Sequence, residues 1–145
     1  MKRWMSWLCA VPVVVSVSTS AMAQTPNRAY APIPLTPGRE VNDRLSDADI
    51  PTGQGNFARD YIVQLQAGDQ IAIDLSSDSF DTIVMLMTTN GSTVAENDDG
   101  PDGTTNSLLF TRITRTGNYI VRVRAFGETA GGPFKLRLTR LRPVQ

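Results

Sequence analysis

The segment "ENDDGPDG", from Glu96 to Gly103, holds the densest group of side chains in the sequence that could do chemistry. It supplies carboxylate and amide oxygens within seven residues, and its glycines let the backbone fold round a centre. Such hard oxygen ligands suit calcium, which takes six to eight of them. We therefore expect a weak calcium site formed by four aspartates: Asp81, Asp98, Asp99 and Asp102.

Repulsion among these carboxylates supports the calcium hypothesis, because no Lys or Arg lies between Asp60 and Thr111 to neutralise them locally. The segment is not an EF-hand, since Leu109 stands where that loop requires a glutamate. The alternative is turn chemistry, in which Asn and Asp side chains bond to their own neighbouring backbone. The sequence leaves these two interpretations open.

Catalysis is not expected, because the sequence contains no histidine and its single cysteine, Cys9, lies near the N-terminus. A Ser-His-Asp or Cys-His relay and an imidazole metal site are therefore excluded. Two carboxylates about 5 to 10 Å apart could still hydrolyse a glycoside. Adjacent residues such as Asp98 and Asp99 tend to diverge, so a carboxylate-dependent hydrolase is kept only as an alternative.

Basic residues alternate with apolar ones in the last two predicted strands. If Val121, Val123 and their partners face the core, the basic side chains point outward and those of the two strands oppose each other. An anionic polysaccharide, lipid headgroup or acidic protein could neutralise them, as could acids within the fold such as Asp60 or Asp74. The candidate ligand-binding residues are Arg122, Arg124, Lys135 and Arg137.

The start of the sequence has the features of a secretory signal peptide: basic Lys2 and Arg3, an apolar run too short to span a membrane, and small residues ending at Ala23. We therefore assign residues 1–23 to a signal peptide, 24–37 to a proline-rich linker and 38–142 to one domain. Cleavage would place the protein in the periplasm or outside the cell. It would also remove two of the 14 basic residues and leave a net charge of 12 − 14 = −2, which argues against nucleic acid as a partner.

Charge is distributed unevenly along the predicted mature chain. Residues 24–110 contain four arginines and 13 acids, whereas residues from 111 onward contain eight basic residues and one acid. This distribution predicts a dipolar surface unless the two parts interleave in the fold.

Apolar residues recur with a period of two from about residue 39 onward, which predicts strands and no helix. We expect about eight strands in an all-β sandwich, with Asn90-Gly91 forming a type I′ hairpin turn. The predicted core residues are Tyr61, Val63, Leu65, Ile71, Ile73, Leu75, Leu86, Leu108, Tyr119, Val121, Val123, Leu136 and Leu138. Because Arg122 points outward in this scheme, we expect Arg122→Ala to be tolerated.

The ordered series "RDYIVQLQAGDQIAIDLSSDSFDTIVMLMTTNGSTVAENDDG", "NSLLF" and "TGNYIVRVRAFGETAGGPFKLRLTRL" resembles the bacterial pre-peptidase C-terminal domain. The shared features are an Asp-Tyr strand, a Gly-Asp turn, Phe-Asp before an apolar strand, Asn-Gly, Asn-Asp-Asp and a Gly-x-Tyr strand. The resemblance covers roughly residues 38–141. It implies a single jelly-roll-like β-sandwich of the kind appended to secreted peptidases.

Together, the residues and the resemblance favour an exported, non-catalytic binding or accessory module that acts on an extracytoplasmic protein or polysaccharide. Calcium is the only cofactor expected. The alternatives are the carboxylate-dependent hydrolase and a module that regulates a separately encoded secreted peptidase.

Overall fold

Ten strands and no helix make up the described part of this computed structural model, which comprises residues 30–101, 103–127 and 131–141. The strands are β1 (Ile33–Pro34), β2 (Glu40–Leu45), β3 (Ile50–Pro51), β4 (Phe57–Leu65), β5 (Gln70–Ser76), β6 (Thr82–Thr88), β7 (Thr93–Asn97), β8 (Ser107–Arg112), β9 (Gly117–Ala125) and β10 (Gly132–Leu141). The expectation of about eight strands is confirmed. The two additional strands, β1 and β3, are only two residues long.

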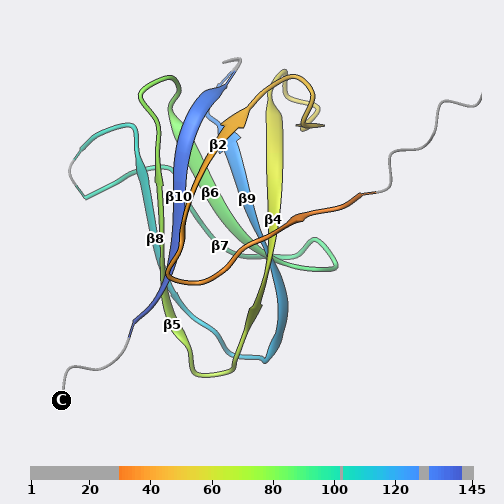
Figure 1. Cartoon of the computed structure of the whole chain (residues 1–145), viewed down its shortest axis with the longest axis vertical. Coiled ribbons are helices and arrows are strands. Elements are labelled where there is room, and N and C mark those ends of the chain that lie inside the picture. Colours follow the sequence, from red (N-terminus) through yellow and green to blue (C-terminus); the bar gives the residue numbers. More distant parts are fainter. Residues whose placement is uncertain (1–29, 102, 128–130, 142–145) are drawn as a thin grey trace, which may run out of the picture. The chain divides into compact units, whose positions relative to one another are not determined.

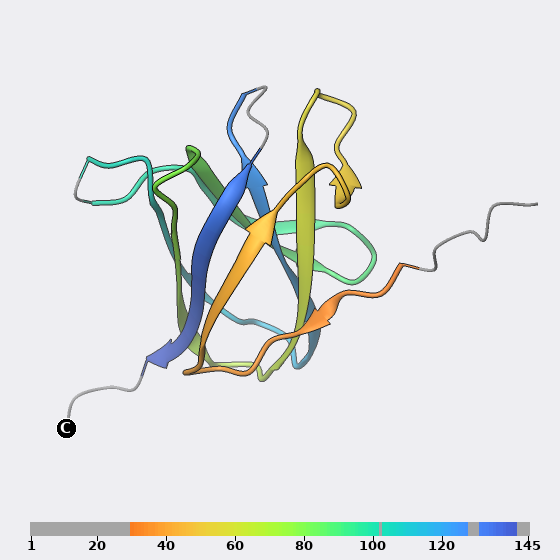
Figure 2. The same cartoon turned by 45° about the horizontal axis from the view of Figure 1, so that its top comes forward.

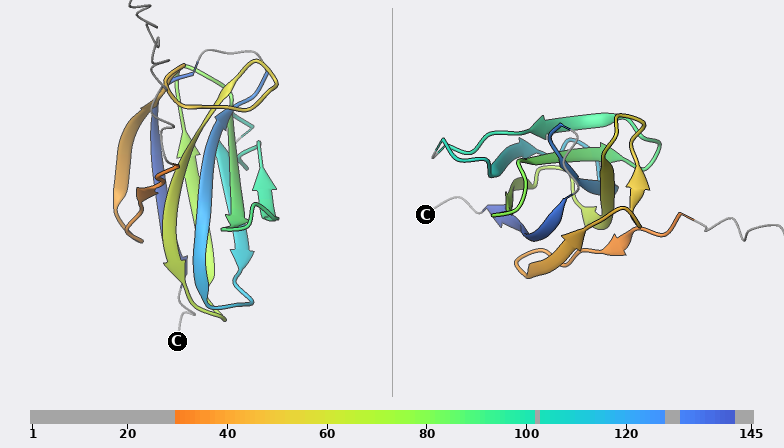
Figure 3. Two further views of the ribbon diagram at one scale, coloured as in Figure 1. Left: turned by 90° about the vertical axis from the view of Figure 1, so that its right-hand side faces the viewer. Right: turned by 90° about the horizontal axis from the view of Figure 1, so that it is seen from above.

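Two sheets form the sandwich (Figure 1). The six-stranded sheet has the order β1-β4-β9-β6-β7, with β3 also paired to β4, and the four-stranded sheet has the order β2-β10-β5-β8. All neighbours are antiparallel except β1 and β4. Figure 2 shows β2 running beside β10, and Figure 3 shows the strands from the side and from above.

The core lies between the sheets and follows the predicted alternation. Twelve of the 13 predicted core residues are buried. The exception is Leu108, which is only partly buried, because β8 places its neighbour Leu109 opposite the inward-facing Ile73 and turns Leu108 outward beside Asp74. Because two leucines are adjacent, the sequence alone could not show which of them faces the core. A shift of one residue in the strand pairing exchanges the inward and outward faces.

The proline-rich segment predicted as a linker contributes to the sandwich at its C-terminal end. Ile33 and Pro34 pair with β4, and the amide of Leu35 donates to the carbonyl of Ile62 at 2.8 Å. Leu35 is buried in the core. A two-residue strand at a sheet edge tolerates proline, since its missing amide faces away from the partner. The predicted signal peptide, residues 1–23, lies outside the described residues.

The hairpin between β6 and β7 forms where Asn90-Gly91 predicts it, but with a different turn. Gly91 has φ +90°, whereas no described residue other than glycine has positive φ, so Asn90 cannot complete a type I′ turn. The amide of Gly91 donates to the carbonyl of Thr88 at 3.0 Å, and the amide of Thr88 donates to the carbonyl of Ser92. This is a type I turn followed by a glycine bulge, the usual geometry of a three-residue hairpin loop.

The predicted separation of charge along the chain does not become a separation in space. Each of the two basic C-terminal strands is flanked on both sides by strands from the acidic part of the sequence: β9 by β4 and β6, and β10 by β2 and β5. This interleaving prevents a simple dipole. The cross-strand neighbours of each basic residue therefore determine whether its charge is neutralised within the fold.

Candidate functional site

The described part of the acidic segment forms no metal cluster. Within residues 30–101, 103–127 and 131–141, no three His, Cys, Asp or Glu side chains come close enough to hold an ion, so Asp81, Asp98 and Asp99 are not assembled. Asp102 lies outside the described residues. The side chain of Asn97 caps the turn instead, accepting from the amide of Asp99 at 2.6 Å and donating to the carbonyl of Leu108 at 3.0 Å.

The four basic candidates lie on two different sheets. Arg122 and Arg124 point outward from β9 in the six-stranded sheet, whereas Lys135 and Arg137 point outward from β10 in the four-stranded sheet. The predicted opposition of like charges is therefore wrong. The two strands are consecutive in sequence and both have apolar inner faces, but the connection between them crosses from one sheet to the other.

Acids within the fold neutralise the pair on β9. Arg122 lies directly across from Asp60 of β4 and donates to it twice, from Nε at 2.7 Å and from Nη2 at 2.8 Å. The Asp60 side chain is only 1% exposed, so this two-pronged bond holds a carboxylate that water hardly reaches. Arg124 lies 4.0 Å from Glu96. Neutralisation by Asp60, one of the two sequence-based alternatives, is thus the arrangement at Arg122, and we now expect Arg122→Ala to be destabilising.

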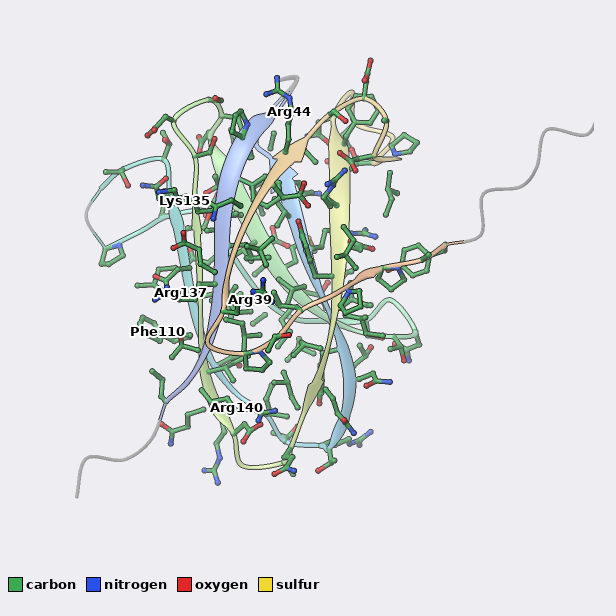
Figure 4. The ribbon with its side chains drawn as sticks, viewed as in Figure 1. Arg39, Arg44, Phe110, Lys135, Arg137 and Arg140 are labelled. Atoms are coloured by element: carbon green, nitrogen blue, oxygen red, sulfur yellow. The ribbon has the colours of Figure 1, made fainter. Side chains whose placement is uncertain are left out.

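The outward side of β2 and β10 presents three exposed cations, Arg44, Lys135 and Arg137, which we call the basic face. Figure 4 shows them one below another along the two strands. Lys135 lies across from Asn42 and Ser76, which carry no charge. Neither Arg44 nor Lys135 forms an ion pair with any residue that the structure describes.

Acids beside the basic face offset it only in part. Arg137 lies across from Glu40 on one side and Asp74 on the other, and its Nη2 is 3.8 Å from the Glu40 carboxylate. Both side chains of that pair are at least 40% exposed, so water screens the attraction strongly. Sequence reasoning found Lys135 and Arg137 but missed Arg44. The pairing of β2 with β10, strands about 90 residues apart in the chain, has no local sequence signal.

A second polar cluster, formed by Asp43, Asp49, Arg59 and Tyr61, connects the two sheets at the β2 edge. Arg59 of β4 donates from Nη1 to Asp43 at 2.5 Å and from Nε to Asp49 at 2.8 Å. The Tyr61 hydroxyl donates to the other Asp43 oxygen at 2.7 Å. The sequence analysis did not single out any of these as polar partners.

Electrostatics in this cluster fix its protonation state. Burial disfavours the charged form of Asp43, but hydrogen bonds from Tyr61 and Arg59 outweigh it and hold the pKa of Asp43 below its usual range. Burial, reinforced by the neighbouring carboxylate, raises the pKa of Tyr61 above its usual range. Asp43 thus stays ionised and Tyr61 neutral near neutral pH. Because Tyr61 is fully buried and its hydroxyl is already bonded, the cluster is better suited to holding the sheets together than to acting on a substrate.

Comparison with known proteins extends the fold assignment. The sequence model of the bacterial pre-peptidase C-terminal domain matches residues 58–125. A crystal structure of the pre-peptidase C-terminal domain of collagenase from Bacillus anthracis superposes with a TM-score of 0.59 at 11% identity, covering 78% of this chain and 99% of that one. PliG from Aeromonas hydrophila, a periplasmic inhibitor of g-type lysozyme, gives 0.57 at 12% identity, covering 75% of this chain and 95% of its own. The search of curated proteins gives no significant match.

These comparisons agree with the sequence resemblance. The matched residues run from β4 to β9 and therefore include the centre of the six-stranded sheet, together with β5 and β8 of the four-stranded sheet. At 11–12% identity the two structural neighbours support the fold alone. The family model and the sandwich coincide on the same strands, so the sequence resemblance to the bacterial pre-peptidase C-terminal domain is confirmed over residues 58–125.

Proposed function

We propose that this protein is an exported, non-catalytic accessory module that binds an acidic extracytoplasmic protein through its basic face. The observation that carries the proposal is that Arg44 and Lys135 are exposed on one sheet face and form no ion pair with the residues that the structure describes. On the opposite sheet, Arg122 and Arg124 each have an acidic neighbour.

The spacing of the basic face fits a partner with several carboxylates. Lys135 and Arg137 are two residues apart on one strand and therefore about 7 Å apart along it. Arg44 lies on the adjacent strand opposite Pro133, which makes it a diagonal neighbour of Lys135 at about 7–8 Å. A surface that presents acids at such intervals would meet several cations at once. Complementary charges of this kind contribute to association rate and specificity more than to affinity.

The family and the fold support an accessory role. Domains of this family accompany peptidases and need not carry a catalytic site of their own, and PliG shows that a sandwich of this fold can serve as a protein-binding scaffold. The proposal takes no partner from either relative. Export rests on the predicted signal peptide; no helix in the described residues is long and apolar enough to cross a membrane.

The hydrolase alternative gains no support from the described residues, because Asp81, Asp98 and Asp99 do not assemble and the partly buried Asp43 is bonded to the buried Tyr61. Regulation of a separately encoded peptidase is a special case of the proposal, in which that peptidase is the acidic partner.

Binding to two polyanions of different backbone tests the proposal. We expect the protein to bind poly-L-glutamate in a salt-sensitive manner, and the double variant Lys135→Glu with Arg137→Glu to bind at least tenfold more weakly. The control is Arg115→Glu, a charge reversal at an exposed arginine in the β8–β9 loop. Because the double variant reverses two charges and the control reverses one, an equal loss per reversed charge would mean a net-charge effect and would overturn the basic face. Tighter binding to polygalacturonate would change the partner class to an acidic polysaccharide.

A further inference from the structure

The outer edge of β8 is open along part of its length. β8 is the last strand of the four-stranded sheet, so only β5 pairs with it as a strand. Leu108 turns its backbone away from β5: its amide donates to the carbonyl of Asp99 at 3.5 Å, and its carbonyl accepts from the Asn97 side chain. The segment around residues 97–99 therefore covers the edge at Leu108.

Beyond Leu108 this cover ends. Backbone direction alternates along a strand, so Phe110 and Arg112 turn their amides and carbonyls to the same outer side as Leu108. Ile113 is an odd number of residues away and faces the β5 side. Its amide donates to the carbonyl of Asp69 at 2.8 Å, and its carbonyl accepts from the amide of Gly68 at 2.7 Å. No backbone or side-chain bond to the outer side of Phe110 or Arg112 occurs among the described residues. Two donors and two acceptors are thus available at this edge.

The other sheet edges are blunted by features that oppose further pairing. β1 and β3 are two residues long and contain proline, β7 has a register shift against β6, and β2 alternates charged side chains along its outward face. Short strands, proline, bulges and charge are the means by which natural edges avoid partners. The β8 edge instead carries Phe110, which at 62% has the largest exposed fraction of the large hydrophobic side chains described.

We propose that an extended peptide segment of another exported protein adds to β8 at Phe110–Arg112, with an apolar side chain beside Phe110 and an acidic one beside Arg112. Figure 4 shows Phe110 at the margin of the molecule, outside β8. Strand addition of this kind gains main-chain hydrogen bonds for affinity and reads alternate side chains for specificity.

Charge determines which segment fits. Arg112 is exposed and forms no ion pair with a described residue, and the residues in the same row across the sheet are Gln70 and Leu141, neither of them acidic. Phe110 lies in a row with Ala72 and Thr139. A second copy of this chain would bring its own Arg112 to the same edge and add positive charge, so an acidic foreign segment is favoured. The site is separate from the basic face and does not depend on it.

Amide-resolved NMR of the nitrogen-15-labelled protein tests the inference, with the capped pentapeptide acetyl-Thr-Val-Thr-Glu-Thr-amide as the probe. The Val and Glu side chains of this peptide lie on one side of an extended strand. We expect shift changes and at least threefold slower hydrogen exchange at the amides of Phe110 and Arg112. The amide of Thr111, which faces β5, should change little.

Charge exchange between protein and peptide provides the control. Replacing the peptide's Glu by Lys should weaken binding at least tenfold, and Arg112→Glu should reverse the preference between the two peptides, which a misfolded variant could not do. Lys135→Glu with Arg137→Glu should leave this binding unchanged. Shift changes confined to other strands would overturn the proposal, as would unreversed preference in Arg112→Glu. Concentration-dependent protection of Phe110 without peptide would identify a second copy as the occupant and overturn the foreign segment.

Discussion

Replacing Asp43 by Asn tests whether the cluster between the sheets stabilises the fold through charge. Asp43 accepts hydrogen bonds from Arg59 at 2.5 Å, from Tyr61 at 2.7 Å and from the amide of Arg44 at 2.8 Å. A hydrogen bond to a charged group contributes about 1.5–3 kcal/mol to stability. Asn keeps one accepting oxygen but loses the charge and offers Tyr61 a donor instead. We therefore expect a loss of about 2 kcal/mol near pH 7, or about 8 °C in melting temperature for a domain of this size.

The pH dependence of this loss distinguishes charge from shape. The pKa of Asp43 is lower in the folded protein than its ordinary value of 3.8. Its stabilisation is then fully present above about pH 4 and is lost as the pH falls through the folded value. Urea unfolding of the wild type and Asp43→Asn should thus differ by about 2 kcal/mol at pH 7. The difference should shrink at the lowest pH at which both still fold.

Asp47→Asn makes the same chemical change at an exposed aspartate four residues away and should alter the unfolding free energy by less than about 0.5 kcal/mol. A gap between the wild type and Asp43→Asn that stays constant across the pH range would refute the charge argument. Equal losses for both variants would refute the role of the cluster.

Three further predictions concern other parts of the sandwich. Arg122→Ala should lower the unfolding free energy by about 3 kcal/mol in urea titrations, because it removes the guanidinium from the buried carboxylate of Asp60; tolerance would show that other contacts suffice for that acid. Gly132→Ala should lower the melting temperature by at least about 5 °C for two reasons. The new methyl group would lie 2.5 Å from the Ser79 side chain, and the backbone of residue 132 has a φ of +150°, which residues other than glycine rarely adopt. If the predicted calcium site forms, a hundredfold excess of calcium over Kd should raise the melting temperature by on the order of 10 °C, and by less after Asp98→Asn with Asp99→Asn; the turn that Asn97 caps predicts instead coincident melts with and without chelator.

Alternation of side chains made much of the fold predictable. β4, β5 and β9 each alternate apolar and polar residues over enough positions to fix both strand type and inward face. Where two apolar residues are adjacent, as at Leu108 and Leu109, the pattern could not choose between faces, and the pairing with β5 decided it. Local composition also misled at Leu35, because prolines suit an edge strand as well as a linker.

Sheet membership was not predictable in the same way, and the candidate site depended on it. Arg122 and Arg137 have the same local pattern, a basic residue between two buried apolar ones. Because β9 and β10 belong to different sheets, Arg122 meets the buried carboxylate of Asp60, whereas Arg137 meets the solvent-exposed carboxylate of Glu40. Such contacts join residues about 60 to 100 positions apart, so no window of sequence contains both partners.

The contrast between the outward faces of the two sheets is what argues for a partner. On the six-stranded sheet, the carboxylate that meets Arg122 is almost wholly removed from water, an arrangement that would be costly to leave unpaired and is complete within the chain. On the four-stranded sheet, Arg44 and Lys135 contribute little to the fold, because neither has an ion-pair partner within the part of the chain that the structure describes and both are exposed. Exposed apolar and cationic side chains also remain together at the open edge of β8. Binding should therefore be sought on the four-stranded sheet, whose exposed cations find few acidic partners among the described residues.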